Sequence, residues 1–427
     1  MSMTVHAEEP KLSYLKNLTK HQGYIAGLII GQATDKHYFV IHLARTPSSL
    51  SPKSKYTSIM ALLQGKFDSA DVNPFKNVFV IPENNIVDHA RFVTRMLPGG
   101  MRVLGIFLVS PGKILEDTKA LIHIHSICTM MDRKLSQNTF LHGNCLRQRK
   151  LVLHMCSQSY KTECGMLGKT PKGSIEKVFL TFQSQPFEWY HFGCRYKINK
   201  VFPLGKINMV LAMKHHLMSL LKSVNRDVMN DKWHWACNQM AVVLVLPCDH
   251  EQQEEVEITP CSSGLCIKGN LGSSVFMHDK STVCELVRAI KQDIVRSLAS
   301  RFEIYCDYFL EEKCFSQEYT VLHNPPKRVF IPLPGSVVTF SDYLFPEDRR
   351  AEAFISFHKV LDVNVESEGI VDFEDNAHVS IEVNVSNTNI EVNENERMST
   401  VSGMANALVV LSSTAEDGEI KVRISVG

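Results

Sequence analysis

The segment from Arg95 to Pro111 constrains the fold of this chain more than any other, because helix, turn and strand signals follow one another in it without a gap. Pro98-Gly99-Gly100 predicts the end of a helix, since proline cannot continue the hydrogen-bond ladder and glycine accepts the left-handed cap. The apolar run from Val103 to Val109 predicts a buried strand. Pro111 is tolerated in a first helical turn, so Ser110-Pro111 predicts the start of the next helix.

The residues on either side extend this pattern into an α/β unit. The preceding helix is predicted to begin near Asn84 or Asn85, which are favoured cap residues. The following helix carries an apolar stripe at Ile114, Leu121, Cys128 and Met131. Further upstream, we expect a short helix at 12–21, a buried strand in the glycine-bounded apolar run at 23–32, and an antiparallel partner strand at 38–45. We therefore predict a first α/β domain over residues 1–145, with an irregular insertion at 47–82.

A second α/β domain is predicted over residues 146–361. Strands are expected at 151–156, 177–182, 187–192, 241–246 and 274–278, and a helix at 210–221. The helix at 281–301 is the clearest in the chain, because Thr282 and Glu285 have the spacing of a capping box. The strand at 328–337 contains Pro332 and Pro334 followed by Gly335, which predicts an edge strand that these residues terminate. A last short helix is expected at 351–361. The fold class is α/β (α+β).

Residues 362–427 form a tail of different composition. Between 362 and 397, ten acidic residues face one basic residue, Arg397. Valine, asparagine and serine fill the gaps, which predicts an acidic, largely disordered tail. Residues 380–385 have the pattern of a strand that could pair.

Composition excludes several classes of function. The net charge of +1 offers no bulk field for nucleic acid or an anionic membrane, so no nucleic-acid partner is expected. The 12 cysteines are scattered without a CxxC pair, which indicates reduced thiols in a cytosolic compartment. No signal peptide is recognised, and no stretch has the roughly 20 apolar residues of a membrane span. The chain by itself is expected to be soluble and cytoplasmic, without a cofactor.

The strand at 103–109 also resembles the metal-binding segment of MPN (JAB) metallo-isopeptidases. Those domains begin with a G-L-L-x-G strand, to which Gly27-Leu28-Ile29-Ile30-Gly31 is similar. Their later strand carries two metal-binding histidines, and the corresponding positions here are Leu108 and Ser110. Leucine has no lone pair to donate and serine is a poor zinc ligand, so this alignment predicts a catalytically dead MPN-like domain. The alternative is a generic α/β domain that shares a buried strand.

Other residues suggest metal or nucleophilic chemistry only weakly. His123-Ile124-His125, with Asp132 downstream, lies in a predicted helix, where residues two apart point about 200° away from each other. His215-His216, Trp233 to Cys237 and Cys261 to Cys266 lack the spacing of a four-ligand site, and packing is the better interpretation. A Cys–His hydrolase remains open in principle, although no cysteine has a local nucleophile signature.

Several motifs together resemble one family. They occur in the same order as in the odorant response abnormal protein 4 family and cover about residues 12–361. The most specific are Arg95 to Gly100 with Val103 to Phe107, and Arg328 to Ser336 with Asp342-Tyr343. Supporting segments are Gly27 to Gln32, Arg45-Thr46-Pro47 and Val287 to Ile294.

This resemblance implies a non-catalytic adaptor rather than an enzyme. Family members support folding, maturation and trafficking of a subset of odorant seven-helix receptors to cilia, in olfaction and chemotaxis. They associate with the ubiquitin-fold-modifier-specific protease at the cytosolic face of the endoplasmic reticulum or on cytoplasmic vesicles. The family's C-terminal membrane anchor is not recognised after Asp362. A vesicle-coat scaffold acting without the protease is a further alternative.

We expect no catalytic, cofactor or metal residues. Structural or interaction roles are predicted for the turn and strand residues Gly27, Gly31, Pro98, Gly99, Gly100, Gly105, Pro332, Pro334 and Gly335.

Overall fold

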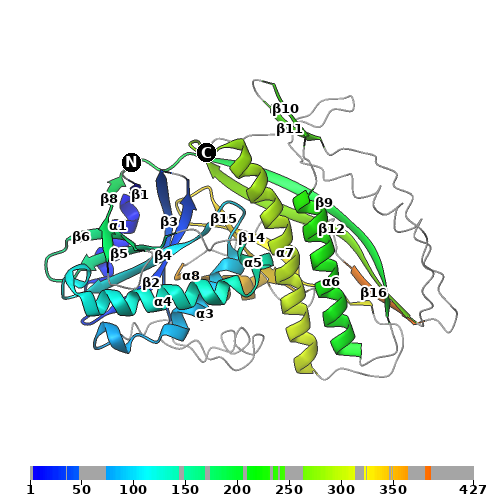
Figure 1. Cartoon of the computed structure of the whole chain (residues 1–427), viewed down its shortest axis with the longest axis horizontal. Helices are drawn as coiled ribbons and strands as arrows, with labels where there is room; N and C mark the ends of the chain where they lie inside the picture. Colours follow the sequence, from blue (N-terminus) through cyan, green and yellow to red (C-terminus); the bar gives the residue numbers. More distant parts are fainter. Residues whose placement is uncertain are drawn as a thin grey trace.

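A computed structural model provides the fold of the chain (Figure 1). It describes residues 3–34, 36–47, 74–143, 149–168, 174–204, 209–230, 234–238, 241–245, 263–312, 322–323, 325–345, 348, 350–363 and 380–385.

The first part of the chain is organised around an eight-stranded sheet. Its spatial order is β7-β6-β5-β4-β2-β3-β1-β8, so the central strands are those of the apolar runs. The strands are β1 (Thr4–Glu8), β2 (Ile25–Ala33), β3 (His37–Arg45), β4 (Arg102–Ser110), β5 (Leu151–Cys156), β6 (Thr162–Leu167), β7 (Ile175–Lys177) and β8 (Phe179–Gln183). β2 pairs antiparallel with both β3 and β4, whereas β4 and β5 run parallel.

The two ends of this sheet are consecutive in sequence. β7 pairs with β6 and β8 pairs with β1, and only Val178 separates β7 from β8. The backbone N–H of Val178 donates to the carbonyl oxygen of Cys164 at 3.1 Å. One extended stretch therefore joins both ends and closes the sheet on itself. The strands at the two ends thus have neighbours, whereas in an open sheet they would be exposed edges.

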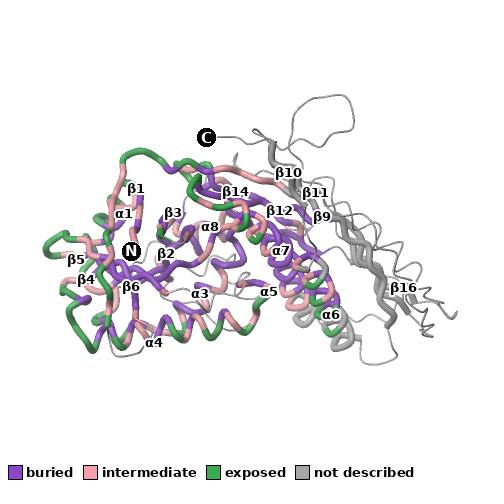
Figure 2. The backbone as a smooth tube through the Cα atoms, turned by 45° about the horizontal axis from the view of Figure 1, so that its top comes forward, coloured by how far each residue is buried: buried purple, intermediate pink, exposed green. Residues whose placement is uncertain are grey.

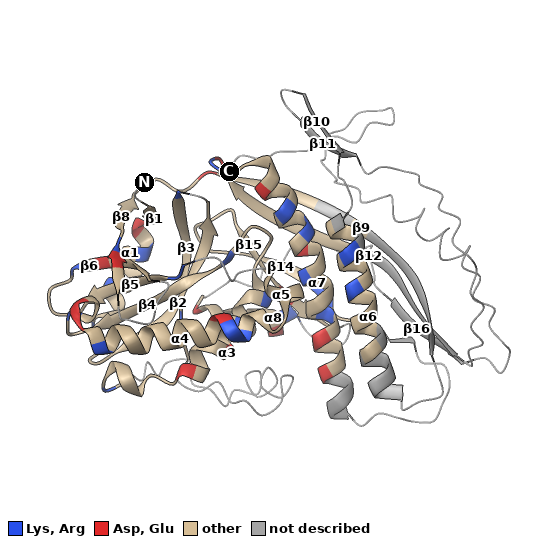
Figure 3. Ribbon diagram, in the orientation of Figure 1, with Lys and Arg blue, Asp and Glu red and all other residues tan. Residues whose placement is uncertain are grey.

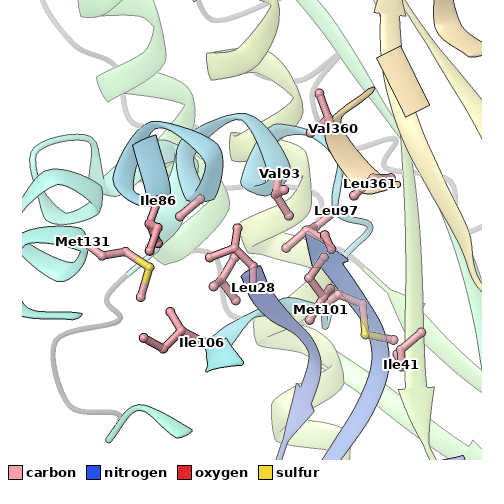
Figure 4. Close-up of a cluster of buried hydrophobic side chains, with 14 of the residues drawn as sticks. Leu28, Ile41, Ile86, Val93, Leu97, Met101, Ile106, Met131, Val360 and Leu361 are labelled. Carbon is pink, nitrogen blue, oxygen red and sulfur yellow. The ribbon is translucent and has the colours of Figure 1, made fainter. Parts of the chain in front are cut away.

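Both faces of the sheet are buried, which explains why β4 has no polar side chain from Val103 to Val109. Leu104, Phe107 and Val109 face a core that includes α1 (Glu9–Leu18). Val103, Ile106 and Leu108 face the opposite core, which is covered by α3 (Glu83–Met96), α4 (Thr118–Ser136) and α8 (Arg350–Leu361). Figure 4 shows Leu28 and Ile106 of the sheet beside Ile86 and Val93 of α3, with Met131 of α4 nearby.

A second layer contains two long helices beside a four-stranded sheet of order β13-β16-β12-β9. The helices α6 (Met209–Asn230) and α7 (Val283–Glu312) lie side by side against the β9–β12 ribbon, and their inner faces form a separate core (Figures 1 and 2). The strands are β9 (Trp189–Leu204), β12 (Ser263–His278), β13 (Leu322–His323) and β16 (Ser380–Val385).

Shorter elements complete the fold. Two hairpins are formed by β10 (His234–Asn238) with β11 (Ala241–Val245), and by β14 (Lys327–Pro332) with β15 (Thr339–Leu344). The others are the 3-10 turns η1 (Val78–Val80) and η2 (Ile114–Glu116), and the one-turn helix α5 (Thr139–His142). Basic and acidic residues are interspersed along α7, whereas the charged residues of α4 lie near its two ends (Figure 3). In the part of the chain that the structure describes, no helix combines the length and apolar character needed to cross a bilayer.

The predicted mixed α/β class is confirmed, and most elements lie where their sequence patterns indicate. The helix after β4 is an exception, because α4 begins at Thr118 and not at Pro111. Asp117 accepts hydrogen bonds from the backbone N–H groups of Lys119 and Ala120 and so fixes the start of α4. The strand predicted over 328–337 is also shorter: β14 ends at Pro332, where the chain turns back into β15.

The predicted domain boundaries stay predictions, but the course of the chain across them is clear. The first sheet continues past residue 145 as far as Gln183. In the acidic segment, residues 380–385 form β16, which pairs antiparallel with β12. The remainder of the predicted disordered tail, 364–379 and 386–427, lies outside the described residues, as does most of the predicted insertion at 47–82.

Candidate functional site

The strand end at Leu108 and Ser110 is the position where an MPN-like enzyme would hold its metal. In the parallel pairing of β4 with β5, Leu108 lies opposite His154 and Ser110 lies opposite Cys156. Since alternate residues of a strand share a face, all four side chains belong to one face of the sheet. Leu108 is fully buried in the core under α3 and α4, so it contributes packing at this position.

Ser110 has a hydrogen-bond partner that the sequence pattern does not reveal. The Ser110 Oγ lies 3.0 Å from the Nε2 of His154, and both residues are buried. The same hydroxyl lies 3.3 Å from the Gly112 carbonyl oxygen. A serine hydroxyl has one proton, so it donates either to this carbonyl oxygen or to His154, and the tautomer of the ring decides which. The imidazole can act as a general base toward the hydroxyl only in the tautomer that accepts the serine proton.

Cys156 ends β5 beside this pair. Its thiol donates to the Pro111 carbonyl oxygen at 3.7 Å. Burial raises the pKa of the thiol, but hydrogen bonds from the Ser159 side chain and from the backbone of Ser159 and Gln158 lower it, and the net pKa is below its usual value. Cys164 provides the contrast, since burial raises the pKa of its thiol to about 12. Cys156 is thus the more acidic of the two thiols.

His123 and His125, whose sequence spacing suggested a metal site only weakly, contact different partners. His123 Nδ1 lies 3.3 Å from Glu83, whereas His125 Nε2 lies 3.3 Å from the Gly168 carbonyl oxygen. Asp132 forms an ion pair with Lys150 at 3.0 Å. Among the described residues, no group of three or more histidine, cysteine, aspartate or glutamate side chains could hold a metal.

The other candidate segments are only partly described. His215 is exposed on α6, residues 234–237 lie in β10, and residues 263–266 lie in β12. His216 also lies in α6, but its side chain, together with Trp233, Cys261 and Ser262, lies outside the described residues.

The Pro98-Gly99-Gly100 turn connects the first sheet to the second layer. The Gly99 N–H donates to the Ser274 carbonyl oxygen at 2.8 Å, and the Phe276 N–H donates back to the Gly99 carbonyl oxygen at 3.0 Å. A Cβ on Gly99 would lie 2.5 Å from Cγ2 of Val275. Gly100 has a φ of +84°, and a Cβ there would lie 2.4 Å from the Phe276 carbonyl oxygen. β12 approaches too closely for a side chain at either position, through the Val275 side chain at Gly99 and through the Phe276 backbone at Gly100.

Buried charged side chains donate hydrogen bonds to carbonyl oxygens at this turn. Asp293 of α7 and Arg328 of β14 form a two-point ion pair at 2.8 and 3.0 Å, with both side chains fully buried. Arg328 also donates to the Leu97 carbonyl oxygen at 3.3 Å. Arg296 of α7 donates to the carbonyl oxygens of Leu97 and Pro98, both at 3.3 Å.

Gln32, near the end of β2, forms hydrogen bonds with both this turn and β12. Its Nε2 donates to the Gly100 and Phe276 carbonyl oxygens at 3.3 and 3.0 Å, and its Oε1 accepts from the His278 N–H at 2.9 Å. The most specific motif segments therefore meet at one buried junction, where their carbonyl groups are satisfied.

The Arg45-Thr46 segment holds the end of α8. Arg45 forms an ion pair with Asp362 at 3.2 Å. His42 and His89 contact the Leu361 and Val360 carbonyl oxygens at 2.6 and 2.7 Å. Burial lowers the pKa of both histidines to about 4, so both rings are neutral at pH 7. The side chains that face the C-terminal end of this helix therefore fix where the chain leaves it.

The remaining predicted structural residues lie in strands or in one turn. Gly27, Gly31 and Gly105 sit in strands where a Cβ would lie within 2.3 Å of a neighbouring carbonyl oxygen. Pro332 is the last residue of β14, and Pro334 and Gly335 lie in the turn before β15, where Gly335 has a φ of +72°. Sequence reasoning assigned no role to His154 and Arg296, and it included Gln32 and Asp293 only as members of motif segments. A polar residue inside an apolar pattern can be recognised from the sequence, but the pattern does not show which residue it will contact.

The fold and the site together define a class: an α/β protein with a closed sheet, whose candidate metal-binding strand end carries a buried leucine and a hydrogen-bonded serine. The comparisons with known proteins assign the family. The family model described as "Odorant response abnormal 4-like" matches residues 27–235 and 236–372. The chain belongs to this family.

Relatives from several animals are similar over most of their length. "Protein odr-4 homolog" of Mus musculus is 26% identical over 87% of this chain and 85% of its own. The homolog of Gallus gallus is 27% identical over 90% and 88%. "Odorant response abnormal protein 4" of Caenorhabditis elegans is 23% identical over 66% and 64%.

Among solved structures, UfSP from C. elegans is similar with a TM-score of 0.41 and 9% identity, over 85% of this chain and 56% of that one. A likeness this distant leaves the fold to be argued from the chain's own topology, and the MPN hypothesis stays a prediction.

Proposed function

We propose that the chain is a non-catalytic adaptor that supports folding, maturation and trafficking of a subset of odorant seven-helix receptors to cilia. The observation that carries the proposal is the family match over residues 27–372, which includes both of its most specific motifs. The printed names of the relatives refer to the odorant response. In this proposal the chain works by binding the ubiquitin-fold-modifier-specific protease at the endoplasmic reticulum or on cytoplasmic vesicles.

The geometry of the strand end supports a role without catalysis. Leu108 packs in the core, and the Ser110 hydroxyl lies within hydrogen-bond distance of the Gly112 carbonyl oxygen. The buried ion pair of Asp293 with Arg328 and the turn at Gly99 hold the two layers in a fixed arrangement. A rigid surface of this kind suits a scaffold, because little conformational entropy is lost when a partner binds.

A second candidate is a cysteine-dependent hydrolase, favoured by the lowered pKa of Cys156 beside the buried His154. The two proposals differ in what Cys156→Ser does. An adaptor keeps binding the protease and keeps delivering receptors to the cilium, whereas a hydrolase using this thiol loses activity. Cys164→Ser is the matched control, because its thiol is buried on the same hairpin and has a raised pKa.

The experiment uses the full chain expressed in receptor-bearing cells, with co-purification of the protease and surface delivery of the receptor as readouts. We expect the wild-type chain and both serine variants to give equal results. Loss of delivery in Cys156→Ser alone would favour the hydrolase. Receptor delivery without co-purification of the protease would favour the vesicle-coat scaffold.

A further inference from the structure

Three histidines that are far apart in sequence meet where the first sheet contacts the end of β12. His6 lies on β1, His37 begins β3 and His278 ends β12. The His6 Nε2 lies 3.1 Å from the His37 Nδ1. The ring of Phe39 stacks on His278 with a centroid separation of 3.7 Å and on His6 with one of 5.4 Å. We call His6, His37 and His278 with Phe39 the histidine junction.

The junction is packed on one side and charged on the other. The rings of Phe187 and Trp189 meet His278 edge-on, at centroid separations of 6.0 and 5.4 Å, and both aromatic residues are buried. The Lys280 ammonium lies 5.9 Å from the Phe39 ring centroid. Thr181 of β8 contacts His6 Nδ1 at 3.1 Å.

Protonation would place like charges together at this contact. Of the charged groups that act on the three rings in the described part of the chain, Lys36 and Lys280 are basic and Asp279 is acidic. The Asp279 carboxylate faces the Nδ1 of His278, and the two form an ion pair only when this ring is protonated. Charging the three rings would add up to three positive charges to a junction that contains this single acidic group, and like charges in a partly buried site repel strongly.

We propose that the histidine junction is a proton-sensitive latch, which holds the turn between β12 and α7 against the first sheet at neutral pH and releases it on acidification. This inference does not depend on the proposed function.

The hydrogen bonds at the junction give the mechanism. One neutral imidazole of the His6–His37 pair donates to the other, whereas two protonated rings are both donors and lose this bond. His278 Nδ1 accepts from the Lys280 N–H at 3.3 Å; protonation removes this acceptor and lets Nδ1 donate to the Asp279 carboxylate instead. Burial lowers the pKa of His278 to about 4, and burial together with the neighbouring cations lowers the pKa of His6 and of His37. These directions place the release below pH 6.5, at which the model-peptide imidazole is half protonated.

Contacts outside the junction limit how far the release extends. Gln32 accepts from the His278 N–H at 2.9 Å and from the Ser281 hydroxyl at 3.0 Å. The backbone pairing of Gly99 with Ser274 and Phe276 contains no titrating group. We therefore expect the turn to open while the two layers stay together.

Trp189 provides a local reporter. In the full chain with Trp233→Phe and Trp235→Phe, Trp189 is the single tryptophan. We expect its emission to shift to the red as the pH falls from 7.5 to 4.5, with a midpoint between 6.5 and 4, before far-UV circular dichroism changes. In the same background, His278→Gln should remove most of this shift. His125→Gln, on α4 and remote from the junction, should leave it unchanged.

Histidine NMR titration of the unsubstituted chain gives a second test that needs no variant to fold. The latch requires that at least His6 and His278 titrate below 6.5. Ordinary pKa values for both, or a Trp189 shift that coincides with global unfolding, would overturn the proposal. So would a full shift in His278→Gln.

Discussion

At the scale of single residues, two neighbouring glycines of a sequence motif form a close contact with β12. Gly99 and Gly100 follow Pro98, and the motif by itself indicates only the end of a helix. In the structure, a Cβ at either position would collide with β12, and Gly100 additionally has a φ of +84°. The motif is therefore as much a docking site for β12 as a helix terminator.

The two effects at Gly100 can be separated by alanine substitution. Gly335→Ala meets a positive φ with no atom within 4 Å of the new Cβ, and should lower the free energy of unfolding by about 1–2 kcal/mol. Gly100→Ala adds a backbone clash and should cost clearly more than Gly335→Ala. Gly112→Ala, where the Cβ meets nothing and φ is not positive, should be close to neutral. Urea denaturation of the three variants tests this order, and an equal loss at Gly100 and Gly335 would contradict the close approach of β12.

At the scale of elements, α7 begins where its sequence indicates. The Glu285 carboxylate accepts from the Thr282 N–H at 2.8 Å, and the Thr282 hydroxyl accepts from the Glu285 N–H at 3.3 Å. The two side chains thus satisfy backbone donors that the first helical turn leaves without partners. Local chemistry of this kind is independent of the rest of the fold, which is why spacing alone predicted it.

Removing this cap should destabilise the second layer. Thr282→Ala is expected to lower the free energy of unfolding by about 1 kcal/mol, as for other N-cap substitutions. Thr282→Ser keeps the hydroxyl and serves as the control, with little expected change. A thermal denaturation series compares them, and equal midpoints for alanine and serine would show that the cap does not contribute.

At the scale of the whole molecule, buried neutral histidines link stability to pH. Burial lowers the pKa of His42 and His89 to about 4 and that of His142 to about 3. Unfolded, these imidazoles titrate near 6.5. Between pH 6.5 and 4 the unfolded chain therefore binds more protons than the folded chain, and the free energy of unfolding falls as the pH is lowered through this window.

One carboxyl group acts in the opposite direction. Burial raises the pKa of Asp342 to about 7, so between its unfolded pKa of 3.8 and 7 the folded state binds the extra proton. Its contribution is full at low pH and is lost as the pH rises through 7. Three histidines outweigh one carboxyl, so we expect a net decrease in stability from pH 6.5 to 4.5, measured as a falling urea midpoint. Asp342→Asn removes the carboxyl group whose protonation opposes the effect of the histidines, so the decrease in stability should become steeper. A urea midpoint that stays constant over this range would contradict these pKa directions.

The sequence by itself determined the elements whose signals are local. Apolar runs predicted β2, β4 and β5, the capping box predicted the start of α7, and the Pro-Gly-Gly break predicted the end of α3. Local signals also misplaced the start of α4, since Pro111 is acceptable in a helix but Asp117 provides the cap. β1 was not recognised, because its five residues alternate too briefly to be distinguished from a loop.

Only the tertiary structure decided which of these elements meet. The closure of the sheet through Val178 and the pairing of β16 with β12 join segments that are far apart in sequence. The Asp293–Arg328 pair and the contact of His154 with Ser110 are likewise long-range. Such partners are chosen by packing and by the cost of burying a polar group alone, which a local pattern does not contain. The sequence therefore predicted that Arg102 to Ser110 form a strand, but it did not predict which residues lie next to the end of that strand.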